Sequence, residues 1–139
     1  MKNKTINEIE QEIISEFAMF DTWMDKYEYI IELGKSLPLI DEKFKIDDYK
    51  VSGCQSQLWV KADKDNDRII FSADSDAIIS KGLISLLIRV LSNQKPEDIA
   101  KAKLEFIDKI GMKEHLSPNR ANGLQAMIDR MKRFAKGYL

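Results

Sequence analysis

Residues 57–72, QLWVKADKDNDRIIFS, place a segment rich in apolar side chains on each side of a polar turn. Leu58, Val60 and Ala62 share one face at a spacing of two, which is typical of a half-buried strand. The run KDND at 64–67 favours a turn, and the strand pattern resumes at 68–72. The stretch therefore predicts a β-hairpin.

Helical patterns precede this hairpin. Isoleucines and a phenylalanine at helical spacing predict an amphipathic helix over residues 6–17. A second helix is expected to be capped by Asp21 or Thr22 and to end at Gly34. Residues 41–48 then form a polar connection to the hairpin.

Three more helices are expected after the hairpin. Ser75 or Asp76 is predicted to cap a helix that runs to Leu91, and its broad apolar arc makes it the central buried helix. Prolines in their first turns predict a fourth helix over 96–111 and a fifth over 117–134. Helices that precede and follow a small antiparallel hairpin along the chain make an α+β domain.

Composition limits the class of function. The chain has 139 residues, a net charge of −1 and 44% hydrophobic residues, which predict one globular domain over 1–139. A near-neutral chain is a poor candidate for binding nucleic acid by phosphate neutralisation. There is neither a signal-peptide core nor an apolar run of membrane-spanning length, so we expect a cytoplasmic protein with no membrane partner.

Charge is nevertheless uneven along the chain. Residues 1–32 carry three basic and eight acidic side chains, whereas residues 120–139 carry five basic and one acidic. Two interpretations stay open: solvated helix faces that pair with each other, or a basic C-terminal segment that steers an acidic protein partner.

A single cysteine, Cys54, narrows the chemistry. One thiol excludes an internal disulfide, and it is too few for a thiolate zinc or iron–sulfur site within the chain, so no metal is expected. Gly53 before it favours a loop tip just ahead of the hairpin, and its neighbours are polar rather than apolar. The thiol is either inert or offered to another molecule.

No basic residue lies beside Cys54 to activate it, although an unperturbed thiol of pKa about 8.5 is only about 3% ionised at pH 7. A hydrolase would need the single histidine, His115, whose position before the fifth helix favours a local role. Trp23 and Trp59 are expected to pack in the core or on the sheet.

Arg120 is predicted in the first turn of the fifth helix, where a cation opposes the helix dipole. It is either solvent-exposed or held by a partner. The partner of Arg120 would then be Asp74, Asp76, a backbone carbonyl or another protein.

Four separated motifs resemble the SufE family, the sulfur-acceptor partners of cysteine desulfurases. They are VSGCQSQLW at 51–59, Trp23 with KYEYIIELG at 26–34, DSDA at 74–77 followed by KGL at 81–83, and HLSPNR at 115–120 followed by NGL at 122–124. The resemblance covers nearly the whole chain and implies a fold like that of iron–sulfur scaffold proteins.

The resemblance also implies a function. Cys54 would accept a persulfide sulfur from a SufS-like, pyridoxal-phosphate-dependent cysteine desulfurase, stimulate that enzyme, and pass the sulfur to a SufBCD-like scaffold complex. The chain would be an accessory protein rather than an enzyme, would bind no cofactor itself, and could form a weak homodimer. The residues expected to position the loop or contact the partner are Gly53, Gln55, Gln57, Asp74, Asp76 and Arg120.

Two other functions compete with the carrier. One is an interaction adaptor or regulator of a desulfurase whose cysteine is not the carrier. The other is a scaffold that builds the cluster itself, which would need several thiolates and therefore an oligomer.

Overall fold

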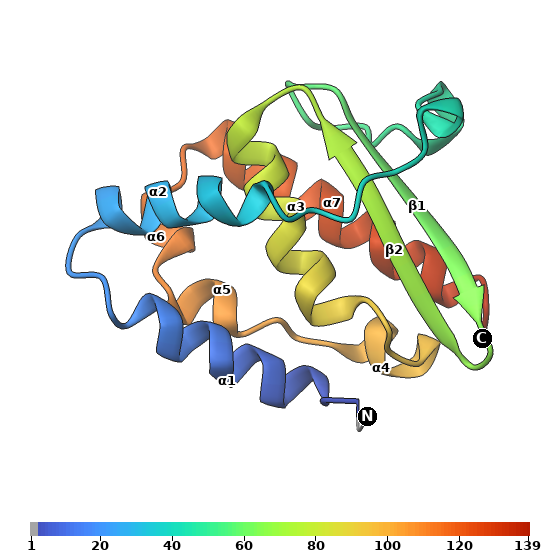
Figure 1. Ribbon diagram of the computed structural model, residues 1–139, viewed down its shortest axis with the longest axis horizontal. Helices are drawn as coiled ribbons and strands as arrows, with labels where there is room; N and C mark the ends of the chain where they lie inside the picture. The colour runs from blue at the N-terminus through green and yellow to red at the C-terminus, as the bar shows by residue number, and fades with distance from the viewer. Residues whose placement is uncertain (1–2) are drawn as a thin grey trace.

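The computed structural model describes residues 3–139, which form helices around one antiparallel hairpin (Figure 1). The hairpin consists of β1 (Leu58–Asp65) and β2 (Arg68–Ser75), joined by a tight turn in which Asn66 has a φ of 58°. Both strands continue beyond the ends that the sequence predicts, and Leu58 pairs with Ser75 at the open end. The predicted α+β class is confirmed.

Two helices precede the hairpin, as predicted. The first, α1 (Ile6–Phe17), starts at a capping box in which Thr5 and Glu8 bond each other's backbone N–H. The second, α2 (Trp23–Gly34), is capped by Thr22. Two single-turn 3-10 helices, η1 (Glu42–Phe44) and η2 (Asp47–Tyr49), then lead to the hairpin.

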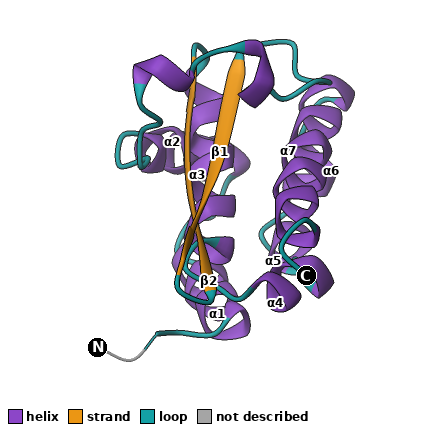
Figure 2. Cartoon of the chain, turned by 90° about the vertical axis from the view of Figure 1, so that its right-hand side faces the viewer, coloured by secondary structure: helices purple, strands orange, loops and turns teal. Residues whose placement is uncertain are grey.

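The central helix α3 (Ile78–Leu91) is buried along most of its length, as its apolar arc predicts. It packs against β2, α1, α2 and the C-terminal helix α7 (Pro118–Lys136). In Figure 2 the two strands pass in front of α3, with α2 at one side of the view and α7 at the other. The predicted cap is wrong: Ala77 occupies the cap position without a side-chain bond, because Ser75 completes β2 and Asp76 bonds the loop before β1.

Close approach of α2 and α3 depends on Gly82. A Cβ there would lie 2.2 Å from the Ile30 carbonyl oxygen, so the two helices cannot pack at this distance with any larger residue. Ser85 ties the same helices together by donating a hydrogen bond to the Leu33 carbonyl.

The predicted fourth helix over 96–111 is wrong as a continuous element. It divides into α4 (Pro96–Lys101), α5 (Phe106–Lys109) and α6 (Met112–His115). Ala102, Leu104 and Phe106 are all buried at a spacing of two, which a helix would distribute over different faces. The chain therefore leaves the helical conformation between α4 and α5, where Leu104 has a φ of 54°.

Charged residues of α1 face α3. Glu12 and Glu16 both pair with Arg89, and Tyr29 donates to Glu16. The Arg89 hydrogen bond lowers the pKa of Glu16 despite partial burial. The ion pairs of the described residues thus place these two acidic side chains against α3 rather than against the basic C-terminal helix.

Candidate functional site

The single thiol lies on a closed loop immediately before β1. The Val51 N–H donates to the Leu58 carbonyl at 2.8 Å, and the side chains of both residues are buried. Gly53 has a φ of +97°, a conformation that side-chain-bearing residues rarely adopt, so it turns the chain at the loop tip. The predicted loop therefore places Cys54 against the body of the protein.

The Cys54 side chain is partly buried against α7. Its Sγ lies 3.6 Å from the Gly123 carbonyl oxygen, to which the thiol can donate a weak hydrogen bond. Burial raises the pKa of the Cys54 thiol. The resting thiol is therefore mostly protonated near neutral pH, and this side chain is not a self-activated nucleophile.

A small cavity of about 160 Å³ opens beside the thiol, which we call the Cys54 cavity. It is formed by the loop, the start of α3 and the first turns of α7. Its lining residues are Cys54, Gln55, Ser56, Ala77, Ile79, Ser80, Leu83, Asn119, Arg120, Gly123 and Met127. Among these, Arg120 alone carries a charge, so the described lining supplies no carboxylate, imidazole or amine to act as a base.

The C-terminal end of the loop is held at Gln57. Its backbone N–H donates to Asp76 Oδ1 at 3.0 Å, and its carbonyl accepts from Ser75 Oγ at 2.7 Å and from the Asp76 N–H at 3.2 Å. Asp76 thus bonds the loop through its carboxylate and its N–H, whereas Gln57 takes part through its backbone. A Ser56–Ser80 hydroxyl contact of 3.0 Å adds a link to α3.

Arg130 of α7 holds the other end of the loop. Its guanidinium donates to the carbonyls of Asp48 and Lys50 at 2.5 and 3.3 Å. Both ends of the segment that carries Cys54 are consequently anchored, one to the β2–α3 junction and one to α7.

Asp74 serves the neighbouring segment rather than the Cys54 loop. Its carboxylate pairs with Lys45 at 2.6 Å and with Lys81 at 3.4 Å. Burial alone would raise the pKa of Asp74, but the bonds from Lys45, the Ser75 N–H and Lys81 outweigh it and lower that pKa. Asp74 therefore fixes the chain around η1 against β2 and α3.

Arg120 has a different partner from the carboxylates considered for it. Its guanidinium lies over the Tyr27 ring, 5.4 Å from the centroid, while Asp74 and Asp76 have the partners given above. Of the alternatives for Arg120, the structure shows the exposed side chain, and neither Asp74 nor Asp76 pairs with it, because α2 brings an aromatic ring to the start of α7. Arg120 nevertheless lines the Cys54 cavity.

His115 has the local role that its position predicts. Its ring stacks on Trp23 with centroids 4.8 Å apart, and Nδ1 lies 2.9 Å from the Gly111 carbonyl oxygen. His115 is not among the residues of the described chain that line the Cys54 cavity. Trp59 lies on the hairpin beneath the Lys45 ammonium.

Sequence reasoning missed Gly123 as a site residue. A Cβ at this position would lie 3.6 Å from Cys54 Sγ, so the absence of a side chain leaves room beside the thiol. A glycine inside a helix destabilises it by about 0.8–1.0 kcal/mol relative to alanine, and that cost is the signal that points to Gly123.

The described residues contain neither a cluster of metal-ligating side chains nor a helix suited to cross a bilayer. No group of three or more His, Cys, Asp and Glu side chains there is arranged to hold a metal ion. No helix in that part of the chain combines the length and the apolar character that a bilayer crossing requires.

The fold and the site define a small α+β domain that carries a loop-borne, partly buried thiol. Sequence comparison identifies the family: residues 11–135 match SufE, described as an Fe-S metabolism associated domain. The chain belongs to the SufE family, and its function is associated with iron–sulfur metabolism.

Individual relatives agree with this assignment. An uncharacterized SufE-like protein of Rhizobium meliloti (strain 1021) is 41% identical over 92% of this chain and 95% of its own length. A second, from Rhizobium etli, is 39% identical over 90% of this chain and 88% of its own. The chloroplastic/mitochondrial SufE-like protein 1 of Arabidopsis thaliana is 38% identical over 90% of this chain, which spans 34% of the plant protein.

The fold also occurs in a solved structure. The solution structure of a hypothetical protein from Thermus thermophilus superposes with a TM-score of 0.76, covering 93% of this chain and 94% of that one. At 19% sequence identity, this likeness shows a shared fold.

Proposed function

We propose that this protein accepts a persulfide sulfur from a cysteine desulfurase on Cys54, stimulates that enzyme by removing its sulfur, and passes the sulfur to an iron–sulfur assembly scaffold. The observation that carries the proposal is the Cys54 cavity. A single thiol faces about 160 Å³ of space, and Gly123 contributes no side chain to fill it.

The space suits one additional sulfur atom. A persulfide places its terminal sulfur about 2.05 Å from Sγ, the length of an S–S bond. With no side-chain atom on Gly123, that sulfur can occupy the cavity while the loop keeps its closed conformation. Ile79, Leu83 and Met127 line the same cavity and provide apolar contacts for it.

The transfer is an exchange at sulfur. The Cys54 thiolate attacks the terminal sulfur of the donor persulfide, the donor S–S bond breaks, and the donor cysteine leaves as a thiolate. The terminal sulfur keeps its oxidation state, so no external oxidant or reductant is needed. The proton that Cys54 loses beforehand balances the one that the donor thiolate takes up.

The environment of Cys54 favours a thiol that waits for a donor. Burial raises its pKa, which suppresses side reactions of the resting protein. Arg120 lines the same cavity, so its guanidinium would stabilise the thiolate if it moved from the Tyr27 ring toward Sγ. Activation would accordingly accompany docking of the partner.

Delivery requires the loop to leave α7. The bonds that hold it are few: the weak Cys54–Gly123 bond, those at Gln57, the Ser56–Ser80 contact, and the Arg130 bonds to the preceding segment. Because a neutral hydrogen bond contributes only about 0.5–1.5 kcal/mol net and one to a charged group about 1.5–3 kcal/mol, a docked partner can replace them.

The proposal is tested by mixing the protein with a cysteine desulfurase, cysteine and pyridoxal phosphate. The expected result is one added sulfur on Cys54 by mass spectrometry, together with faster sulfide release in the presence of reductant. Cys54→Ser should abolish both the added sulfur and the faster sulfide release. The double variant Cys54→Ser, Ser52→Cys carries a thiol two residues away and is the matched control.

Two results would overturn the proposal. One is the absence of an adduct on Cys54 while the desulfurase turns over. The other is undiminished stimulation by Cys54→Ser, which would favour the adaptor that regulates a desulfurase without carrying its sulfur.

A further inference from the structure

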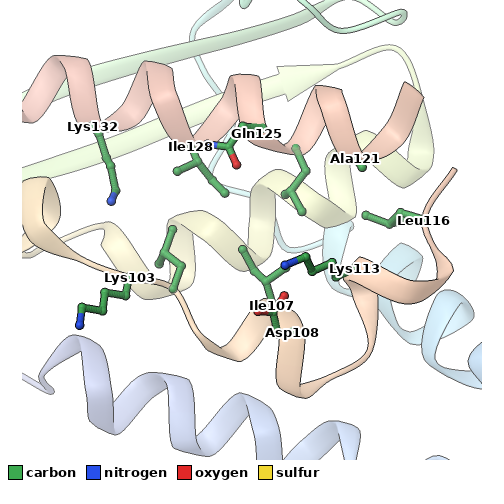
Figure 3. Close-up of a pocket in the computed structure, with 11 residues that line it drawn as sticks. Lys103, Ile107, Asp108, Lys113, Leu116, Ala121, Gln125, Ile128 and Lys132 are labelled. Atoms are coloured by element: carbon green, nitrogen blue, oxygen red, sulfur yellow. The ribbon is translucent and has the colours of Figure 1, made fainter. Parts of the chain in front are cut away.

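A larger cavity lies on a neighbouring face of α7, between this helix and the segment 103–116 (Figure 3). Its volume is about 370 Å³, and we call it the lysine-rimmed cavity. The Cys54 cavity is lined by Arg120, Gly123 and Met127 of α7. The lysine-rimmed cavity is lined by the next residue after each of these, namely Ala121, Leu124 and Ile128. Its lining residues are Lys103, Leu104, Ile107, Asp108, Lys113, Leu116, Ala121, Leu124, Gln125, Ile128 and Lys132.

Apolar side chains form much of its wall. Leu104, Leu124 and Ile128 are buried, and Ile107 and Leu116 are partly buried. Leu104 has a φ of 54°, an unfavourable conformation for a leucine, at the point where the chain leaves the helical path. The break between α4 and α5 thus sets residues 103–108 opposite α7 and frames the cavity.

Lysines supply the charge around this wall. Lys132 is partly buried and donates to the Ala102 carbonyl, which fixes its ammonium beside the cavity. Figure 3 shows Lys132 extending from α7 toward the opposite segment and Lys113 reaching in from α6. No salt bridge within the described chain involves these two residues or Lys103, and with Asp108 included the lining carries a net charge of +2.

We propose that this cavity binds a small organic anion with an apolar body, such as a medium-chain monocarboxylate. Ligand sites are concave, mostly apolar and supplied with a few polar groups, and they occupy about 300–1,000 Å³. An apolar cavity of about 150 Å³ already holds benzene, so about 370 Å³ accommodates an eight-carbon chain. The ammonium groups of Lys113 and Lys132 would pair with the carboxylate.

The test is a titration of the full ¹⁵N-labelled chain with octanoate, followed by two-dimensional NMR. Saturable shifts are expected at the amides of residues 103–132 that line the cavity. Octylamine has the same chain with the opposite charge and should bind more weakly. Lys132→Gln and Lys113→Gln should each weaken octanoate binding about two- to fivefold, the range of a partly exposed ion pair.

Two matched controls separate the site from general charge and hydrophobicity. Lys136→Gln removes a lysine from the same helix outside the lining and should leave octanoate binding unchanged. Ala121→Leu fills apolar space inside the cavity and should weaken binding of octanoate without unfolding the domain, as judged from its own NMR spectrum.

Several results would overturn the proposal: no saturable shift at millimolar octanoate, shifts scattered over the surface, octylamine binding as tightly as octanoate, or equal losses from Lys136→Gln and Lys132→Gln. The readout is independent of Cys54, so sulfur transfer can fail its own test without affecting this one.

Discussion

Replacing Gly123 by alanine should change two properties in opposite directions: the stability of the helix α7 and the space available beside the Cys54 thiol. Alanine is favoured over glycine in a helix interior by about 0.8–1.0 kcal/mol. The new Cβ would lie 3.6 Å from Cys54 Sγ and 4.0 Å from Cys54 Cα, which are ordinary van der Waals distances. The reduced protein should therefore gain up to about 1 kcal/mol in free energy of unfolding.

The persulfide state should respond in the opposite direction. Its terminal sulfur needs the space that the alanine methyl group would take from a cavity of about 160 Å³. Adding a methyl group to a packed site costs about 1–3 kcal/mol, and the lower half of this range corresponds to about a five- to thirtyfold loss. We expect sulfur transfer to Cys54 to fall by that factor.

Urea unfolding measures the stability, and time-resolved mass spectrometry of quenched desulfurase mixtures measures the persulfide on Cys54. Asn122→Ala is the control, because it raises helix propensity at the adjacent exposed position without placing a methyl group at the thiol. Wild-type sulfur transfer by Gly123→Ala would refute the role of this space. A loss of stability would refute the packing on which the calculation rests.

Three further outcomes follow from the geometry. Asp76→Ala removes the carboxylate that accepts from the Gln57 N–H, so alkylation of Cys54 by iodoacetamide should accelerate about two- to tenfold; an unchanged rate would mean that this bond does not hold the loop. Because burial raises the pKa of Cys54 and the thiolate is the reactive form, the midpoint of alkylation against pH should lie higher than that of a free cysteine, and a lower midpoint would contradict the burial. Gly82→Ala would place a Cβ 2.2 Å from the Ile30 carbonyl oxygen and should destabilise the fold by about 3 kcal/mol or more in urea unfolding; a difference under about 1 kcal/mol would show that α2 and α3 can separate at little cost.

Local patterns predict much of this fold because their causes are local. The alternation at 58–62 and the turn after it predict the hairpin, and Thr22 and Ser117 mark helix starts through side-chain caps. The same reasoning fails over 96–111, where buried residues spaced by two follow the demands of the core rather than helical periodicity.

The sequence by itself determined the hairpin and the helices outside residues 96–111, the presence of one thiol on a glycine turn, and membership of the SufE family through separated motifs. Only the tertiary structure decided what surrounds that thiol. Gly123 is 69 residues from Cys54 along the chain, yet it contacts the Sγ atom. Arg120 faces Tyr27 instead of a carboxylate, and this contact too joins residues that are far apart in the sequence. Such pairings depend on how α2 and α7 pack around α3, and side-chain packing between distant elements leaves no periodic signal in the sequence.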